Sequence, residues 1–142
     1  MIEAKWHITL DAWNYLVEST TDRFPDLPKA TIESIENLYE EYGLHESPDG
    51  RYSVKDCVDE LVAETRGEGE ETGLSAEEDR HYESVAVGGC FDGVWVGWTY
   101  FYGGGKHGEP ESMGWLEDAY YIQMETKMVE AKVFERLAEE VE

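Results

Sequence analysis

The sequence predicts an α+β fold, with N-terminal helices packed on a mainly C-terminal antiparallel β-sheet. Apolar residues recur every three or four positions over residues 11–65, whereas residues 81–102 are rich in Val, Trp, Tyr and Phe, with Gly-Gly and Asp-Gly turn signals. A chain of 142 residues has the length of one ordinary domain, and its 41% hydrophobic content suffices for a core. We therefore expect a single domain over residues 1–142, with a helical part at about 11–65, an acidic loop at about 66–79 and a β-rich part at about 80–142.

The first elements are predicted from two different periodicities. Residues 3–10, "EAKWHITL", alternate apolar and polar side chains, which indicates a short half-buried strand. The next stretch, "LDAWNYLVEST", predicts a first helix with Asp11 near its start. The prolines of "FPDLP" bias the residues before them away from helix, so the first helix should end there.

Two further helices are predicted by apolar residues spaced three and four apart. Residues 29–44, "KATIESIENLYEEYGL", form an amphipathic pattern that should stop at Gly43. The sequence "SPDGRY" is typical of a turn. Ser53, with Asp56 three residues later, resembles a capping box and predicts the start of a third helix. The apolar stripe of that helix comprises Val54, Cys57, Val58, Leu61 and Val62.

The C-terminal half follows a strand pattern. Residues 81–102 predict two or more antiparallel strands, and residues 103–114 a glycine-rich loop. The second half of residues 115–126 predicts a further strand. Residues 127–142 are ambiguous between strand and helix, and we expect a strand that ends in a short helix. The helical alternative rests on apolar residues at four-residue spacing: Val129, Val133, Leu137 and Val141.

Charge is the unusual feature of the composition. The 33 acidic residues outnumber 11 Lys and Arg, which gives a formal net charge of -22. Such a chain disfavours direct binding to nucleic acid and adsorption to anionic membranes, because both depend on cations. No apolar segment approaches the ~20 residues that span a bilayer, and the N-terminus lacks the pattern of a secretory signal. We expect a cytoplasmic protein with a basic partner, two free thiols at Cys57 and Cys90, and no disulfide.

The loop from Gly103 to Glu111 is the alternative candidate for a ligand site. Its glycines suggest a phosphate-binding loop, yet Tyr100 and His107 stand where that pattern needs Gly and Ser or Thr. A solvated turn explains the glycines better. A metal site is disfavoured because the His and Glu spacing is unspecific, and we predict no metal, no cofactor and no catalytic residue. The ligand-binding alternative would use Lys106, His107 and Glu109.

The aromatic strand at residues 94–102 could carry a contact surface. An extended strand would place Trp95 and Phe101 on the face opposite Trp98. Tyr and Trp often anchor protein interfaces, so we expect partner binding or self-association as a homodimer. The competing interpretation is a strand buried on both faces by helices or by a second subunit.

Two stretches, "DGVWVGWTYFYGGGKHGEPE" and "WLEDAYYIQ", resemble a segment of small uncharacterised proteins encoded by bacteriophages and prophages. The resemblance covers roughly Val85 to Phe134 and transfers no catalytic residue. It implies a viral or mobile-element origin and action in a bacterial cytoplasm.

These features together favour an acidic phage-type inhibitor of a host protein that handles nucleic acid, such as a defence or restriction protein. Carboxylates spaced like phosphates could occupy the basic cleft of that partner. The alternatives are acidity that serves only solubility, a halophilic protein, and a small enzyme or ligand-binding domain at the glycine loop; an enzyme is the less favoured reading. The expected partner-binding residues are Glu33, Glu36, Glu40, Glu41, Asp56, Asp59, Glu60, Glu64, Glu68, Glu70, Glu71, Trp95 and Phe101.

Overall fold

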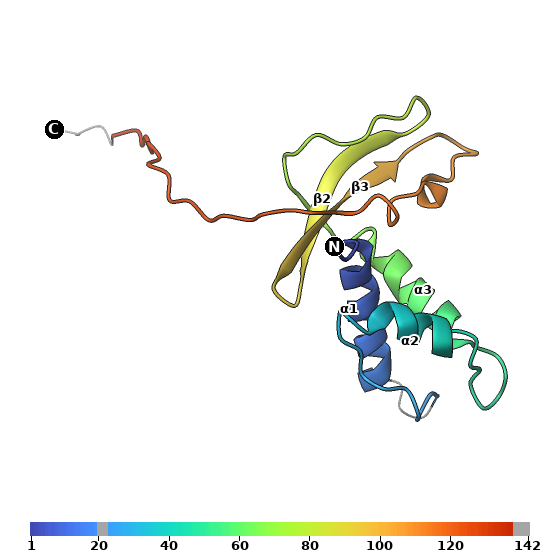
Figure 1. The fold of residues 1–142 in the computed structure, drawn as a ribbon. Helices are drawn as coiled ribbons and strands as arrows, with labels where there is room; N and C mark the ends of the chain where they lie inside the picture. The colour runs from blue at the N-terminus through green and yellow to red at the C-terminus, as the bar shows by residue number, and fades with distance from the viewer. Residues whose placement is uncertain (20–22, 138–142) are drawn as a thin grey trace.

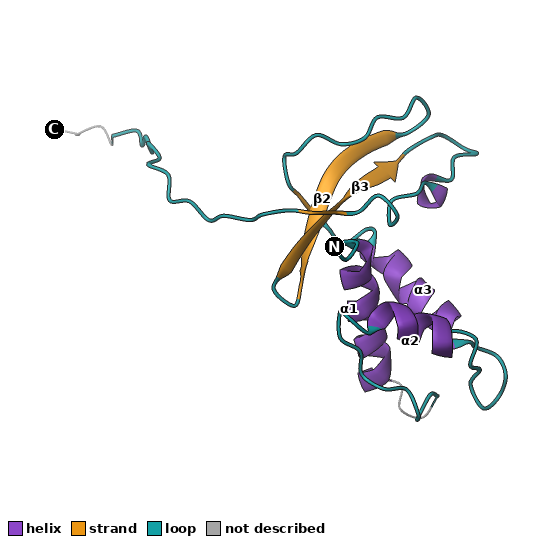
Figure 2. Ribbon diagram, in the orientation of Figure 1, coloured by secondary structure: helices purple, strands orange, loops and turns teal. Residues whose placement is uncertain are grey.

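The computed structural model describes residues 1–19 and 23–137, and within them three helices precede a four-stranded antiparallel sheet (Figure 1). This confirms the α+β prediction. The three helices lie together beside the long β2–β3 hairpin (Figure 2). The sheet order is β1-β2-β3-β4. The elements are α1 (Lys5–Ser19), α2 (Ile35–Tyr42), α3 (Val54–Thr65), β1 (Glu70–Glu71), β2 (Glu83–Phe91), β3 (Val94–Tyr102), the 3-10 helix η1 (Pro110–Ser112) and β4 (Tyr120–Tyr121).

The strand predicted at residues 3–10 is wrong, because residues 5–10 form the first turns of α1 and the residues before them form no strand. The buried positions of the helix include Ile8, Ala12 and Leu16, which recur every four residues across the predicted boundary. The alternation over residues 3–10 is compatible with this helical stripe as well as with a strand. The tertiary contacts of α1 with α3 decide in favour of helix.

The other helices end or begin at the predicted signals, although α2 is shorter than expected. Two hydrogen bonds hold the chain before Ile35: the Ala30 amide donates to Asn14 Oδ1 on α1 at 2.9 Å, and the Thr31 amide donates to Ser34 Oγ at 2.9 Å. The helix ends at Tyr42, followed by Gly43, as predicted. The predicted cap of α3 is confirmed, because Ser53 Oγ accepts from the Asp56 amide at 3.1 Å.

The hairpin of β2 and β3 turns at Asp92 and Gly93, whose φ values are 49° and 83°. Positive φ at both central residues is the geometry that favours Asp-Gly in two-residue hairpins, so the turn signal is confirmed. The Gly-Gly signal is not a turn, because Gly88 and Gly89 lie inside β2. A side chain at Gly88 would lie 2.7 Å from Ile122 Cδ1, so this glycine permits close packing of the chain after β4.

Both faces of β3 are largely covered. One face contributes Val96 and Trp98 to the core shared with the helices, and Trp98 Nε1 donates to Arg66 O at 3.1 Å. The other face is covered by the segments at residues 72–77 and 120–122, which reach Thr99 and Gly97. The expectation that Phe101 is available on an exposed face is therefore wrong, since only 3% of the residue is exposed.

The acidic segment at residues 66–79 is more ordered than the predicted loop. Its middle forms β1, which pairs Glu70 with Gly88 and Glu71 with Val87. Beyond β1, Ser84 Oγ donates to Glu77 O at 2.6 Å. The backbone is thus bound to β2, while most of its acidic side chains remain exposed.

The chain after β4 departs from the prediction. The predicted strand in residues 115–126 is present only as Tyr120–Tyr121. The strand and helix expected over residues 127–142 are absent from 127–137, and the rest of that prediction lies outside the described residues. Figure 1 shows this segment running away from the body of the protein. Within the described part of the chain, every helix is too short or too polar to cross a bilayer.

Candidate functional site

The densest set of predicted partner-binding residues lies on α2, on α3 and just before α2. All of these residues are exposed. The two helices pack together, and Tyr39 on α2 donates from its hydroxyl to Asp59 Oδ1 on α3 at 2.5 Å. No sequence pattern predicts this link between the helices. We call this set the acidic helix surface: Glu33, Glu36, Glu40, Glu41, Asp56, Asp59, Glu60 and Glu64.

The spacing of the carboxylates along α3 is close to that of phosphates along one DNA strand. From Asp56 to Glu64, α3 carries Asp56, Asp59, Glu60 and Glu64. With a rise of about 1.5 Å per residue, this is roughly one carboxylate for every 3–4 Å of helix axis. One strand of duplex DNA carries a phosphate about every 3.4 Å. The helix therefore presents a line of negative charge of similar density.

The acidic helix surface is not neutralised internally. In the described chain, no Lys or Arg side chain lies within 4.0 Å of its carboxylates as an ion pair. The negative charge also acts on Tyr39, whose pKa is raised by burial, by its hydrogen bond to Asp59, and by the charges of Asp59 and Asp56. The carboxylates are therefore free to meet cations from outside.

A second surface lies on the face of the sheet opposite to the one that packs on the helices. There Trp95, which is half-buried, lines a groove of about 420 Å³ together with Glu70 and Glu71 of β1. We call this the outer groove; its remaining wall includes Leu74, Ile122 and Met124. The structure thus unites two acidic residues and one aromatic residue that were predicted separately. Phe101, predicted with them, is buried elsewhere on the same strand.

An acidic cluster that the sequence did not predict lies beside the hairpin turn. Asp11 of α1 comes near Asp92 of the turn and Glu68, and its pKa is raised by burial and by these two charges. A groove of about 400 Å³ separates α1 from Phe91 and Asp92. These residues are far apart in the sequence, so no spacing could have revealed their proximity.

The glycine loop has a structural explanation. Gly103, Gly104 and Gly105 all have positive φ, between 75° and 85°, a conformation that favours glycine. Tyr82 lies against the loop: a side chain at Gly104 would come within 2.5 Å of its ring, and its hydroxyl accepts from the Glu109 amide at 3.1 Å. Lys106 and His107 are exposed. Residues 1–19 and 23–137 contain no group of three His, Cys, Asp or Glu residues placed to hold a metal ion.

Cys57 and Cys90 are free thiols, of which Cys57 is buried and Cys90 exposed, and Arg66 is held by contacts with β3. Burial raises the pKa of Cys57, which disfavours its nucleophilic thiolate. Arg66 lies over the ring of Tyr100, with its guanidinium carbon 4.6 Å from the ring centroid, and donates to the Phe101 carbonyl. Arg66 therefore fixes the start of the acidic segment to β3.

Comparisons with models of protein families, with curated proteins and with solved structures find no match to this chain. Any assignment of function therefore depends on the surfaces themselves.

Proposed function

We propose that this chain is an acidic interaction protein that inhibits a nucleic-acid-handling host protein by binding its basic cleft in place of phosphates. The observation that carries the proposal is the acidic helix surface, whose carboxylates on α3 repeat at about the axial density of one DNA strand. Complementary charge accelerates association and selects basic partners. A net charge of -22 disfavours direct binding to nucleic acid by the same chain.

The proposed setting is a bacterial cytoplasm, with the chain encoded by a bacteriophage or prophage and its partner a defence or restriction protein. This setting rests on the resemblance of roughly Val85 to Phe134 to phage-encoded segments. The helices that carry the acidic helix surface lie outside that resemblance. The inhibitory role therefore rests on charge and geometry, and the setting rests on the resemblance.

The test begins with capture from nuclease-treated bacterial lysate at low salt, followed by elution in a salt gradient and competition with duplex DNA. We expect a basic nucleic-acid-binding enzyme that DNA displaces. Neutralising α3 with Asp56→Asn, Glu60→Gln and Glu64→Gln should weaken capture and inhibition of that enzyme. The matched control, Glu83→Gln, Glu111→Gln and Asp118→Asn, removes the same charge from exposed residues elsewhere and should have a much smaller effect.

Equal losses in the two triple variants would contradict a specific role for α3, since net charge alone would then explain binding. The glycine-loop alternative predicts a different result, because His107→Ala would abolish function while the α3 variant would not. The halophilic alternative predicts unfolding of the unmodified chain at low salt, which circular dichroism would detect.

A further inference from the structure

The segment at residues 127–137, which we call the tail segment, is exposed and carries large apolar side chains among charged ones. It has no helix or strand, and Figure 1 shows it extending from the body. A folded chain that leaves five large apolar side chains in water carries an unpartnered surface. These side chains are between 81% and 101% exposed: Met128, Val129, Val133, Phe134 and Leu137.

The tail segment differs from the rest of the chain in charge. Over residues 127–137 it carries Lys127, Lys132 and Arg136 against Glu130 and Glu135, a local excess of one positive charge that the sequence reverses at Glu139, Glu140 and Glu142. Two copies of such an acidic chain repel each other over most of their surfaces. Lys132 and Arg136, which alternate with the apolar side chains, are therefore the groups of the tail segment that can attract carboxylates of a second copy.

The outer groove is complementary to the tail segment, because it combines apolar side chains with negative charge. Its apolar part includes Trp95, Ile122 and Leu74, of which Leu74 is 52% exposed. Glu70 and Glu71 border it with negative charge. The apolar side chains of the tail segment would thus contact the apolar residues of the outer groove, and the cations of the tail segment would lie near Glu70 and Glu71.

We propose that the tail segment of one copy binds the outer groove of a second copy, and that two copies exchange tails reciprocally. The tail begins at the groove itself, because Met124 and Glu125 form part of the groove wall. From there the chain runs outward, so its own tail would have to reverse direction to reach its own groove. Reciprocal exchange across a two-fold axis satisfies both grooves and forms a closed dimer.

The tail adopts an amphipathic helix when it binds. Val129, Val133 and Leu137 recur every four residues and would form one stripe, with Lys132 and Arg136 beside it. The strand pattern fits less well, because Val133 and Phe134 are adjacent and would point to opposite faces. A short helix of this kind is marginal in water and forms when its apolar face is covered.

The test measures the association of the full chain by sedimentation velocity over a wide concentration range. We expect a monomer–dimer equilibrium. The tail variant Val133→Asp/Phe134→Asp changes only exposed side chains, and it should weaken dimerisation by at least about 30-fold, the scale of interface anchor residues. The control Leu44→Asp places a charge on an 82% exposed leucine of the body and should leave dimerisation unchanged.

A groove variant separates tail exchange from other modes of association. Glu70→Lys/Glu71→Lys should also weaken the dimer, because it places cations opposite Lys132 and Arg136. Mixing the groove variant with the tail variant should recover part of the association, since one of the two contacts, the intact tail of one with the intact groove of the other, is restored in the mixed dimer. The proposal is overturned if the unmodified chain stays monomeric throughout, if the tail variant dimerises as tightly, or if the mixture does not recover.

Discussion

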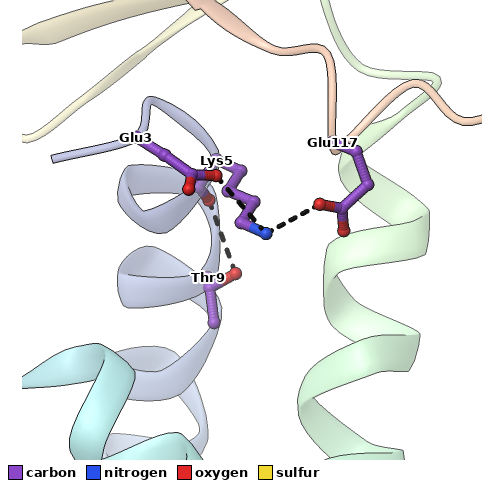
Figure 3. Close-up of polar contacts among 4 residues, drawn as sticks. All are labelled: Glu3, Lys5, Thr9 and Glu117. Carbon is purple, nitrogen blue, oxygen red and sulfur yellow. Dashed lines mark hydrogen bonds and ion pairs between the residues drawn. The ribbon is translucent and has the colours of Figure 1, made fainter.

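Lys5 in the first turn of α1 forms an ion pair with Glu117, which precedes β4, across almost the whole length of the sequence. Lys5 Nζ lies 2.7 Å from Glu117 Oε2 and 3.5 Å from Glu3 Oε2. Figure 3 shows the Lys5 side chain directed from α1 toward Glu117. The contact joins the helical part to the segment that closes the sheet.

Replacing Lys5 with Met should lower the free energy of unfolding by about 0.5–1 kcal/mol, the upper range for partly exposed ion pairs. The hydrogen bond to Glu117 raises the pKa of Lys5 above 10.5, so the stabilisation is present below pH 10.5 and is lost as the pH rises through the raised pKa. Urea denaturation at neutral and alkaline pH measures both effects. Lys29→Met is the control, since Lys29 pairs with Glu18 where both side chains are more than 60% exposed. An equal loss from Lys29→Met would contradict the prediction.

Replacing Asp11 with Asn should raise the free energy of unfolding at pH 7 by about 0.5 kcal/mol, within the range of surface substitutions. Burial, Asp92 and Glu68 raise the pKa of Asp11 above 3.8, so its ionised form is less favourable in the folded state. The penalty is complete above the raised pKa and disappears below pH 3.8, where Asp11 is protonated in both states. The gain should therefore fade on acidification. Asp118→Asn removes the same charge from an exposed site, and an equal gain there would show that net charge alone is responsible.

Replacing Ser53 with Ala should cost about 1 kcal/mol of unfolding free energy, because the Asp56 amide would lose its partner at the start of α3. Thermal or urea denaturation followed by helical circular dichroism measures the loss. Ser75→Ala changes an exposed serine in the acidic segment and should stay within about 0.5 kcal/mol of the unmodified chain. A Ser53→Ala variant as stable as this control would contradict the assigned cap.

Replacing Gly97 with Ala should destabilise the protein by about 1–3 kcal/mol, the usual cost of overpacking. The added carbon would lie 2.6 Å from Tyr120 Cε2 and 3.1 Å from Ile122 Cγ2, so β4 would have to move away from β3. Gly67→Ala is the matched control, since nothing lies within 4 Å of its added carbon. Tryptophan fluorescence during urea denaturation compares the two, and equal stability would show that β4 does not pack as described.

The sequence predicted the elements whose signals are local. The cap at Ser53 and the turn at Asp92–Gly93 depend on a few neighbouring residues, and both are present. The start of α1 was predicted wrongly because the alternation over residues 3–10 fits the period of a strand as well as that of a helix, and only burial against α3 distinguishes the two. The tail segment was misread because its pattern describes a helix or strand that needs a surface to pack on.

The candidate surfaces also divide into features that neighbouring residues determine and features that depend on tertiary packing. The carboxylates of α3 could be placed on one helix from their spacing, and the structure leaves them exposed. Burial of Phe101 could not be predicted, because its cover comes from segments brought to the sheet by tertiary structure. The proximity of Asp11 to Asp92 and Glu68 likewise arises only when α1 packs beside the hairpin.

The contacts between the beginning of α1 and β4 also set the order in which the fold can be completed. Tyr121 donates from its hydroxyl to the Ile2 carbonyl at 2.7 Å and lies 3.1 Å from His7 Nε2. A ribosome adds residues one at a time, so the hydrogen bonds of Ile2 and His7 to Tyr121 cannot form until Tyr121 has been translated and released from the exit tunnel. The contacts of Ile2 and His7 with Tyr121 can therefore form only after the helices and the β2–β3 hairpin have been synthesised.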